Sequence, residues 1–212
     1  MKHRVVLADD HTIVLDGLRR ILEPEVNIVG TATDGRQLVR LIEEFKPEVA
    51  VADISMPSLN GLEALRQCRS AHLRTRFIFL TANLEVGLAT EAFRIGAAGY
   101  VLKVAAGEEL LTAIREVLAG RTYITPRIAG EVMQNLMNPV EESGQALLTI
   151  REREVLQLLA EGKTLKEIGA VLNVSPRTVE FHKNNIVAKT GLRTTAELAR
   201  YAARHGFVSS SD

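Results

Sequence analysis

The 212-residue sequence is poor in the residues that mark specialised classes of protein. It has one cysteine, Cys68, so it can form neither an internal disulfide nor a cysteine-rich metal site, which fits a reducing cytoplasm. No stretch approaches the roughly 20 apolar residues that a membrane span needs, and the first ten residues do not read as a signal peptide. These absences exclude disulfide-rich and membrane-spanning proteins and predict a cytoplasmic protein without a membrane partner.

Net charge is also absent, since 26 basic residues balance 26 acidic ones, but the balance hides a gradient. Residues 1–120 carry 14 basic and 16 acidic residues, a net charge of −2, and residues 121–146 carry 2 and 3, a net charge of −1. Residues 147–212 carry 10 and 7, a net charge of +3. The C-terminal third is mildly basic, which permits nucleic-acid binding without demanding it.

Residues 1–120 alternate between short apolar runs and segments with helical spacing. Continuous apolar strands that are each followed by a helix predict a parallel sheet covered on both faces. Right-handed crossovers place the C-terminal ends of all the strands at one edge. We therefore predict an α/β fold, a flavodoxin-like, doubly wound, five-stranded parallel sheet with strand order 2-1-3-4-5. The five predicted strands are residues 4–8, 27–33, 47–53, 76–82 and 99–103.

Chemically active side chains stand at the ends of four predicted strands. Taken singly, each acid is more often a turn or cap residue, but here three carboxylates converge on one edge. Carboxylates held close together repel unless a cation intervenes, and Mg²⁺ binds oxygen ligands of this kind together with a phosphate oxygen. A hydroxyl and an ammonium at the same edge suit further phosphoryl oxygens. The five residues are Asp9, Asp10, Asp53, Thr81 and Lys103.

These five residues, together with the stretch VADISMPSLNG (51–61), resemble the receiver domain of two-component response regulators over about residues 3–120. The resemblance implies that a sensor histidine kinase phosphorylates Asp53, and this chemistry needs an Asp53 oxygen that is open to solvent. It also implies that Thr81 closes on the phosphoryl group while Tyr100 moves inward. The implied Mg²⁺ ligands are Asp10, Asp53, the Ser55 backbone carbonyl and, through water, Asp9; the implied phosphoryl-binding and switch residues are Thr81, Lys103 and Tyr100.

Residues 121–146 read as a linker that contains a helix. Pro126 suits the first turn of this helix, and Ile128, Val132 and Leu136 follow at four-residue steps. The polar stretch NPVEESGQA (138–146) is typical of a flexible connection. We therefore predict a first domain over residues 1–120 and a second domain over residues 147–212.

The second domain shows helical signals and no strand signals. Thr149 and Glu152 form a capping box, and Ser175 and Pro176 mark the start of a helix that ends at Gly191. Two short helices joined by NVS form a helix-turn-helix, whose second helix should enter the DNA major groove. The motifs LTIREREVL, KEIG, SPRTVEFHKNNI and KTG resemble the LuxR-type DNA-binding domain over about residues 147–208. The whole chain is thus similar to response regulators of the NarL/FixJ type, with an all-α, four-helix second domain.

The expected recognition helix divides into a core face and a DNA face. We expect Val179, Ile186 and Val187 to point into the core. His182 is expected to pack or to contact phosphate, because no partner ligands for a metal lie nearby. The alternative for the polar positions is an ordinary solvated helix face. The base-facing candidates on the family's motif are Glu180, Phe181 and Asn184; the phosphate candidates are Arg177, Lys183, Lys189 and Arg193.

Together the two halves predict a phosphorylation-dependent, DNA-binding transcriptional regulator that is not an enzyme. One domain of net charge +3 should bind weakly alone, so a homodimer formed on phosphorylation is expected. The alanines at 196, 199 and 202 could form its seam or be ordinary helix residues. The expected partners are double-stranded promoter DNA, a sensor histidine kinase, a second copy of the chain and RNA polymerase.

Two alternatives stay open at this point. One is a phosphatase that uses Asp53 as its nucleophile, although such enzymes usually carry a second acid two residues on, where this chain has Ser55. The other is a phosphate-independent regulator that keeps only the shape of a receiver, against which the intact set of acids argues.

Overall fold

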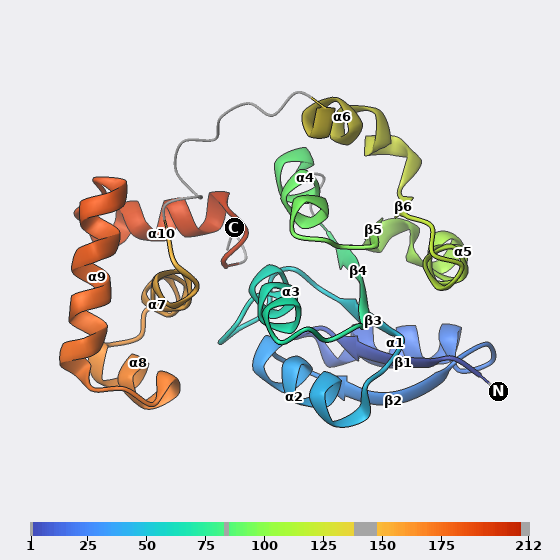
Figure 1. Ribbon diagram of the computed structural model, residues 1–212, viewed down its shortest axis with the longest axis horizontal. Helices are drawn as coiled ribbons and strands as arrows, with labels where there is room; N and C mark the ends of the chain where they lie inside the picture. The colour runs from blue at the N-terminus through green and yellow to red at the C-terminus, as the bar shows by residue number, and fades with distance from the viewer. Residues whose placement is uncertain (1, 83–84, 138–147, 209–212) are drawn as a thin grey trace.

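An α/β part precedes an all-helical part in the computed structural model, which describes residues 2–82, 85–137 and 148–208 (Figure 1). The sheet of the first part is parallel, with strand order β2-β1-β3-β4-β5-β6. The predicted doubly wound arrangement is therefore confirmed. The strands are β1 (Arg4–Ala8), β2 (Asn27–Ala32), β3 (Val49–Ala52), β4 (Arg76–Thr81), β5 (Gly99–Leu102) and β6 (Tyr123–Ile124).

Helices cover both faces of the sheet because alternate strand residues point to opposite sides. Val5 and Leu7 of β1 pack with the helices α1 and α5, whereas Val6 and Ala8 pack with the helices on the other face. Each face of the sheet therefore has its own hydrophobic core, and because the strands are parallel their C-terminal ends lie at one edge. The helices of this part are α1 (Thr12–Leu22), α2 (Gly35–Phe45), α3 (Gly61–Ser70), α4 (Val86–Arg94), α5 (Ala106–Leu118) and α6 (Pro126–Met137), with a 3₁₀ turn at Lys103–Ala105.

The prediction of five strands is wrong by one. Strand β6 pairs in parallel with β5, and the hydroxyl of Thr125 accepts a hydrogen bond from the Leu102 amide at 3.3 Å. A strand of two residues is too short to show the alternation of apolar and polar residues by which strands are predicted. Helix α6 follows, and its Ile128 and Val132 belong to the hydrophobic core beside α4. Residues 121–137 are thus packed on the receiver, and the predicted flexible stretch 138–146 lies outside the described residues.

Four helices form the described stretch of the second part, residues 148–208, as predicted. The capping box of Thr149 and Glu152 is present at the start of α7. Ser175 caps α9, and Pro176 is its first residue. Val179 and Ile186 of α9 lie in the core, but Val187 does not and is only half-buried. Ala202 is also in this core, so it is not available for a dimer seam. The helices are α7 (Ile150–Ala160), α8 (Leu165–Leu172), α9 (Pro176–Thr190) and α10 (Thr195–Arg204).

Helix α7 faces the receiver and lies beside α3, whereas α9 lies on the side of the helical domain away from the receiver (Figure 1). Two opposite faces of the described helical domain therefore have different surroundings. One face is in contact with the sheet domain, and the other is open to solvent.

Candidate functional site

The C-terminal edge of the sheet brings together the side chains that the sequence placed at strand ends. Asp9 follows β1, Asp53 follows β3, and Lys103 follows β5. The Lys103 ammonium lies 2.6 Å from Asp9 Oδ2 and 2.7 Å from Asp53 Oδ2. Lys103 thus contacts two carboxylates that are far from it in the sequence, the more distant of them 94 residues away. Its ammonium group neutralises part of the negative charge of these two carboxylates.

Asp53 is less accessible than the sequence analysis expected. Its side chain is only 8% exposed. Its Oδ1 atom accepts a hydrogen bond from the Ser55 amide at 3.3 Å, and its Oδ2 atom accepts one from Lys103. We expected an Asp53 oxygen that is open to solvent, and the structure leaves only this small exposed fraction of the side chain. A phosphoryl donor has to enter beside the Lys103 ammonium or displace it.

Burial and charge act against each other at this pair. Burial raises the pKa of the Asp53 carboxyl, and the Lys103 ammonium opposes the rise without cancelling it. Burial lowers the pKa of Lys103, but the charges of Asp53 and Asp9 outweigh burial, so that the pKa is raised overall. Lys103 therefore stays protonated at neutral pH and is a permanent cation at the site.

Thr81 and Tyr100 lie together behind the acidic edge. Thr81 is the last residue of β4, and Tyr100 lies on the neighbouring strand β5. Both side chains are buried, and they are hydrogen-bonded to each other. Burial raises the pKa of the Tyr100 hydroxyl, as do the charges of Glu85 and Asp53. The Tyr100 ring already lies inward in this structure. The resemblance implies this inward position for the state in which Thr81 has closed on the phosphoryl group.

His11 is a member of the acidic cluster that the sequence analysis missed. Its Nδ1 atom lies 2.8 Å from Asp10 Oδ1, and its backbone amide donates to Asp9 Oδ1 at 3.0 Å. One ligand atom from each of these three residues lies within 4.8 Å of the others. The signal for His11 was its position directly after the acid pair. The carboxylates of Asp9, Asp10 and Asp53 are oxygen ligands of the kind that a divalent cation prefers, and Asp10 is the most exposed of the three.

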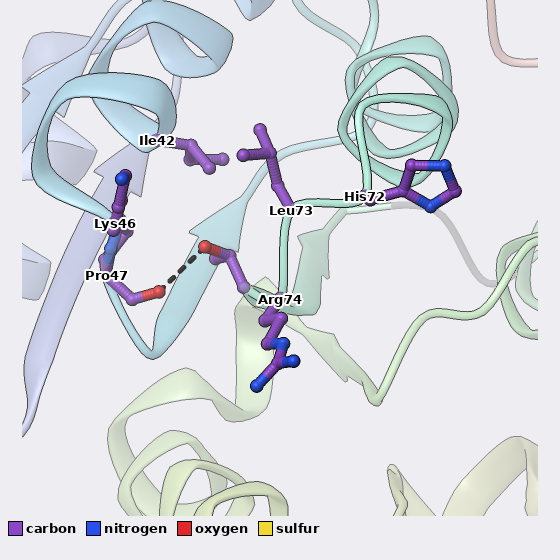
Figure 2. Close-up of a pocket in the computed structure, with 7 residues that line it drawn as sticks. Ile42, Lys46, Pro47, His72, Leu73 and Arg74 are labelled. Atoms are coloured by element: carbon purple, nitrogen blue, oxygen red, sulfur yellow. Dashed lines mark hydrogen bonds between the residues drawn. The ribbon is translucent and has the colours of Figure 1, made fainter.

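A cavity of about 310 Å³ lies at the opposite edge of the sheet, before β3 and β4. Ile42 and Leu73 supply apolar walls, and the Thr75 hydroxyl donates to the Pro47 carbonyl at 2.7 Å. Figure 2 shows that the polar ends of Lys46, His72 and Arg74 point in different directions. No charge converges here, and the residues around the cavity take no part in the strand-end site.

The predicted base-facing residues form one exposed surface on α9. Glu180, Phe181 and Asn184 are all exposed, and the Phe181 side chain is unusual for an apolar residue in being 61% exposed. The Phe181 ring meets the His182 ring edge-on, with centroids 5.6 Å apart. A shallow hollow at this surface is lined by Leu165, Pro176, Arg177, Glu180, Phe181 and Asn184.

The predicted phosphate contacts have different surroundings. Arg177 and Arg193 are exposed, and Lys183 is half-buried. Lys189 donates to Glu152 Oε2 at 2.6 Å, which ties the end of α9 to the start of α7. The ammonium of Lys189 is thus already engaged within the domain. Arg177 and Arg193 are the cations of this group that reach solvent most freely.

Comparison with known proteins places both halves. Residues 5–115 match the family described as response regulator receiver domain, and residues 146–202 match bacterial regulatory proteins of the luxR family. The chain therefore belongs to the two-component response regulators, and within them to the NarL/FixJ type. It is a regulator with a receiver domain and a LuxR-type DNA-binding domain, in a family of DNA-binding transcriptional regulators.

Relatives match over nearly the whole chain. The transcriptional regulatory protein MctR of Rhizobium johnstonii is 36% identical, over 98% of this chain and 96% of its own. Response regulator UvrY of Escherichia coli is 35% identical, over 97% and 96%. Among solved structures, RcsB of Salmonella enterica bound to promoter rprA is 27% identical over 95% of this chain and 98% of its own, with a TM-score of 0.63. No described helix is long and apolar enough to cross a membrane.

Proposed function

We propose that this protein regulates transcription in the cytoplasm by binding promoter DNA, and that phosphorylation of Asp53 by a sensor histidine kinase controls this binding. The observation that carries the proposal is the convergence of Asp9, Asp53 and the Lys103 ammonium within 2.7 Å contacts at the C-terminal edge of the sheet. A second copy of the chain and RNA polymerase are the further partners.

The phosphoryl transfer needs one nucleophile and a cationic surrounding. An Asp53 oxygen attacks the phosphorus atom of the kinase phosphohistidine and forms an O–P bond. The P–N bond breaks, and its electron pair stays on the ring nitrogen. With the other ring nitrogen protonated, the kinase residue leaves as neutral imidazole. Lys103 stabilises the negative charge of the transferred group, and the Thr81 hydroxyl donates to one of its oxygens.

The acidic cluster fits Mg²⁺, which would neutralise the charge that gathers on the phosphoryl oxygens. Asp10, Asp53 and the Ser55 backbone carbonyl would hold it, with Asp9 acting through water. Two observations support this assignment: Asp9, Asp10 and His11 each bring a ligand atom within 4.8 Å of the others, and the Asp10 side chain is 29% exposed, so a cation can reach it from solvent. The single Lys103 ammonium contacts both Asp9 and Asp53, so one positive charge faces two carboxylates, and a further cation would compensate the remainder.

DNA reading falls to the exposed face of α9. Glu180 suits a cytosine amino group, Asn184 suits adenine, and Phe181 suits a thymine methyl group. Arg177, Lys183 and Arg193 are proposed to contact phosphates, and Lys189 would do so only by leaving Glu152. The structure of RcsB, which this chain matches over 98% of the RcsB length, has been solved bound to a promoter. This supports a role of the helical domain in promoter binding here.

Intact-mass measurement tests the receiver half. The protein is incubated with acetyl phosphate and Mg²⁺, and we expect one added phosphoryl group. Asp53→Asn should take up none, whereas Asp16→Asn, an exposed aspartate on α1, should behave as the wild type does. An unmodified wild-type protein would refute the proposal and favour the phosphate-independent regulator. Selection of bound duplexes from a random pool, with and without acetyl phosphate, tests the DNA half.

The phosphatase alternative makes a different prediction. It requires release of phosphate from small phosphorylated substrates by the wild type and loss of this release in Asp53→Asn. Because Ser55 replaces the second acid of such enzymes, we expect no release above the background in either protein.

A further inference from the structure

The segment that follows α5 closes the edge of the sheet directly beside Tyr100. We call residues 123–137, which comprise β6 and α6, the edge segment. Its strand pairs with β5, so that Ile124 lies opposite Tyr100 in the register. The Thr125 amide donates to the Tyr100 carbonyl at 3.0 Å. Figure 1 shows β6 next to β5, and α6 alongside α4.

The side chains of the edge segment cover the face of the sheet on which the Tyr100 ring lies. Neighbours in the register of a parallel sheet point to the same face, and Ile124 packs against the hydrophobic core that contains Tyr100. Ile128 and Val132 of α6 belong to the same core and are almost fully buried, as is Leu88 of α4. The Tyr100 side chain therefore has no exposed surface while the edge segment is in place.

Polar contacts fix the edge segment near both of its ends. At the start of α6, the Thr125 hydroxyl donates to Glu109 Oε2 of α5 at 2.6 Å and accepts from the Leu102 amide of β5. Near the end of α6, Arg94 Nη2 of α4 donates to the Asn135 carbonyl at 3.2 Å. The segment is thus tied to β5, on which Tyr100 lies, and to one helix on each face of the sheet.

The position of β6 decides which directions are open to the Tyr100 ring. A tyrosine on the last strand of a sheet can turn between staggered rotamers, one directed into the protein and another directed past the strand edge toward solvent. Here β5 is followed by β6, and Ile124 lies where the second direction leads. The ring takes the first direction, in which it is hydrogen-bonded to Thr81.

We propose that Ile124 and Ile128 are positioning residues for phosphoryl binding: by closing the edge beside β5 they hold Tyr100 inward, and through Tyr100 they orient the Thr81 hydroxyl. This inference rests on the proposed function, in which Thr81 donates to a phosphoryl oxygen. A threonine hydroxyl has one proton to donate and lone pairs that accept. A hydrogen bond accepted from Tyr100 therefore leaves the Thr81 proton for the phosphoryl group.

The proposal links the position of the ring to affinity in a quantitative way. A ligand that needs one conformation binds more weakly by the fraction of molecules that occupy it. Weakening the edge segment should lower the fraction with Tyr100 inward and the affinity for a phosphoryl group by the same factor. The coupling is reciprocal, so a bound phosphoryl analogue should tighten the edge segment and slow exchange of the Thr125 amide.

The test follows the Tyr100 ring by fluorine NMR in the full-length protein. The chain has three tyrosines and no tryptophan, so 3-fluorotyrosine labelling gives three signals, and Tyr100→Phe identifies the signal of Tyr100. The difference in its chemical shift between H₂O and D₂O measures how far the fluorine is exposed to solvent. Ile128→Ala is compared with the wild type and with two controls, the conservative Ile128→Val and Met133→Ala at an exposed position of the same helix.

Without phosphodonor, the Tyr100 fluorine should show no solvent shift in the wild type or in the two controls. In Ile128→Ala it should show most of the shift of free fluorotyrosine, and Mg²⁺ with beryllofluoride, a phosphoryl analogue, should abolish it. Titration calorimetry should find the affinity of Ile128→Ala for the analogue lowered roughly fivefold or more. This factor should match the inward fraction that the solvent shift gives.

Each other outcome overturns the inference. A Tyr100 fluorine that stays buried in Ile128→Ala would show that the edge segment does not hold the ring. An exposed ring with unchanged affinity would separate the ring from phosphoryl binding. Val132→Ala, which removes fewer atoms from the same core, repeats both measurements if circular dichroism shows Ile128→Ala to be unfolded. Failure of the wild type to accept a phosphoryl group from acetyl phosphate would count against the proposed function, while the solvent shift in the untreated proteins still tests the hold on the ring.

Discussion

The two functional surfaces of this protein are built in opposite ways. The strand-end site of the receiver gathers Asp9, Asp53 and Lys103 from distant parts of the chain, and its carboxylates are nearly buried. The DNA face of α9 lies on one helix, within a few turns, and its side chains are exposed. Changes at the first surface should therefore disturb stability and function together, whereas changes at the second should separate them.

The largest effect on stability is expected for Lys103→Met. This change leaves the buried carboxylates of Asp9 and Asp53 facing each other without the ammonium, and loss of one partner from such a group destabilises a fold by about 3 kcal/mol. Calorimetry in chelator should show this loss, and Mg²⁺ should restore part of it by binding the native state. A Lys46→Met control, at the other edge of the sheet, should be nearly neutral. Equal stability of the two variants would contradict the assigned role of the ammonium.

Gly61→Ala should be next in size. A methyl group on Gly61 would lie 2.3 Å from the Asp53 carbonyl oxygen and 2.9 Å from the Phe79 ring. The loop formed by residues 53–60 would have to shift, and overpacking of this kind destabilises by about 2 kcal/mol. Gly17→Ala is the matched control, because it lies in α1 with nothing within 4 Å and should stabilise by about 0.5–1 kcal/mol. Urea denaturation of the three proteins measures both changes, and a neutral Gly61→Ala would show that the loop yields easily.

Asn184→Ala on the DNA face should weaken DNA binding and leave the stability of the fold nearly unchanged. Loss of one bidentate base contact weakens specific binding roughly tenfold, while an exposed helix position changes stability by about 0.5 kcal/mol or less. Anisotropy titration at fixed salt gives the first quantity and thermal unfolding the second. Ala196→Ser, exposed on α10, serves as a control for binding. A large loss of stability in Asn184→Ala would mean that this face is not separate from the fold.

The smallest effect concerns pH and Glu152, which joins α7 to α9. Burial raises the pKa of Glu152, but hydrogen bonds from Lys189 and from the Thr149 amide outweigh it, so the pKa falls below its ordinary value of 4.5. A lowered pKa means that the stabilisation is complete above pH 4.5 and is lost as pH falls through the native-state value.

Glu152→Gln measures this contribution. Near pH 7 the variant should be less stable than the wild type by about 1 kcal/mol, and the difference should shrink below pH 4.5. Amide exchange in α7 and α9 of the full chain follows it, with the exposed Glu180→Gln as control. A difference that persists unchanged at low pH would assign the effect to packing instead of charge.

Sequence patterns predicted the elements whose signals are repeated along the chain. Apolar runs such as 4–8 and 99–103, each followed by a helical segment, were sufficient to predict a parallel sheet, and the flavodoxin-like strand order then placed Lys103 beside Asp53. The capping box of Thr149 and Glu152 likewise defined the start of α7. These features follow from local periodicity and capping, which the sequence carries directly.

Features made by single long-range contacts could not be predicted. Strand β6 has two residues and exists because β5 offers a free edge. Gln157 looks like any polar helix residue, yet its side chain is hydrogen-bonded to Met56 and Asn60 of the receiver, and Asp53 proved nearly buried, with its oxygens bound by Lys103 and the Ser55 amide. Val187 stands at a helical spacing that suits the core, yet it is only half-buried and lies outside the hydrophobic core. In each case the decisive partner is far away in the chain.

Strand β6 and helix α6 also determine where the chain can be divided for domain exchange. A receiver excised at residue 120 would lose the strand that pairs with β5 and would uncover the surface on which Ile128 and Val132 pack. An open strand edge beside exposed apolar side chains favours aggregation. Chimeras that graft this receiver onto another output domain should therefore place their junction after Met137, even though the familiar five-stranded unit is already complete before that point.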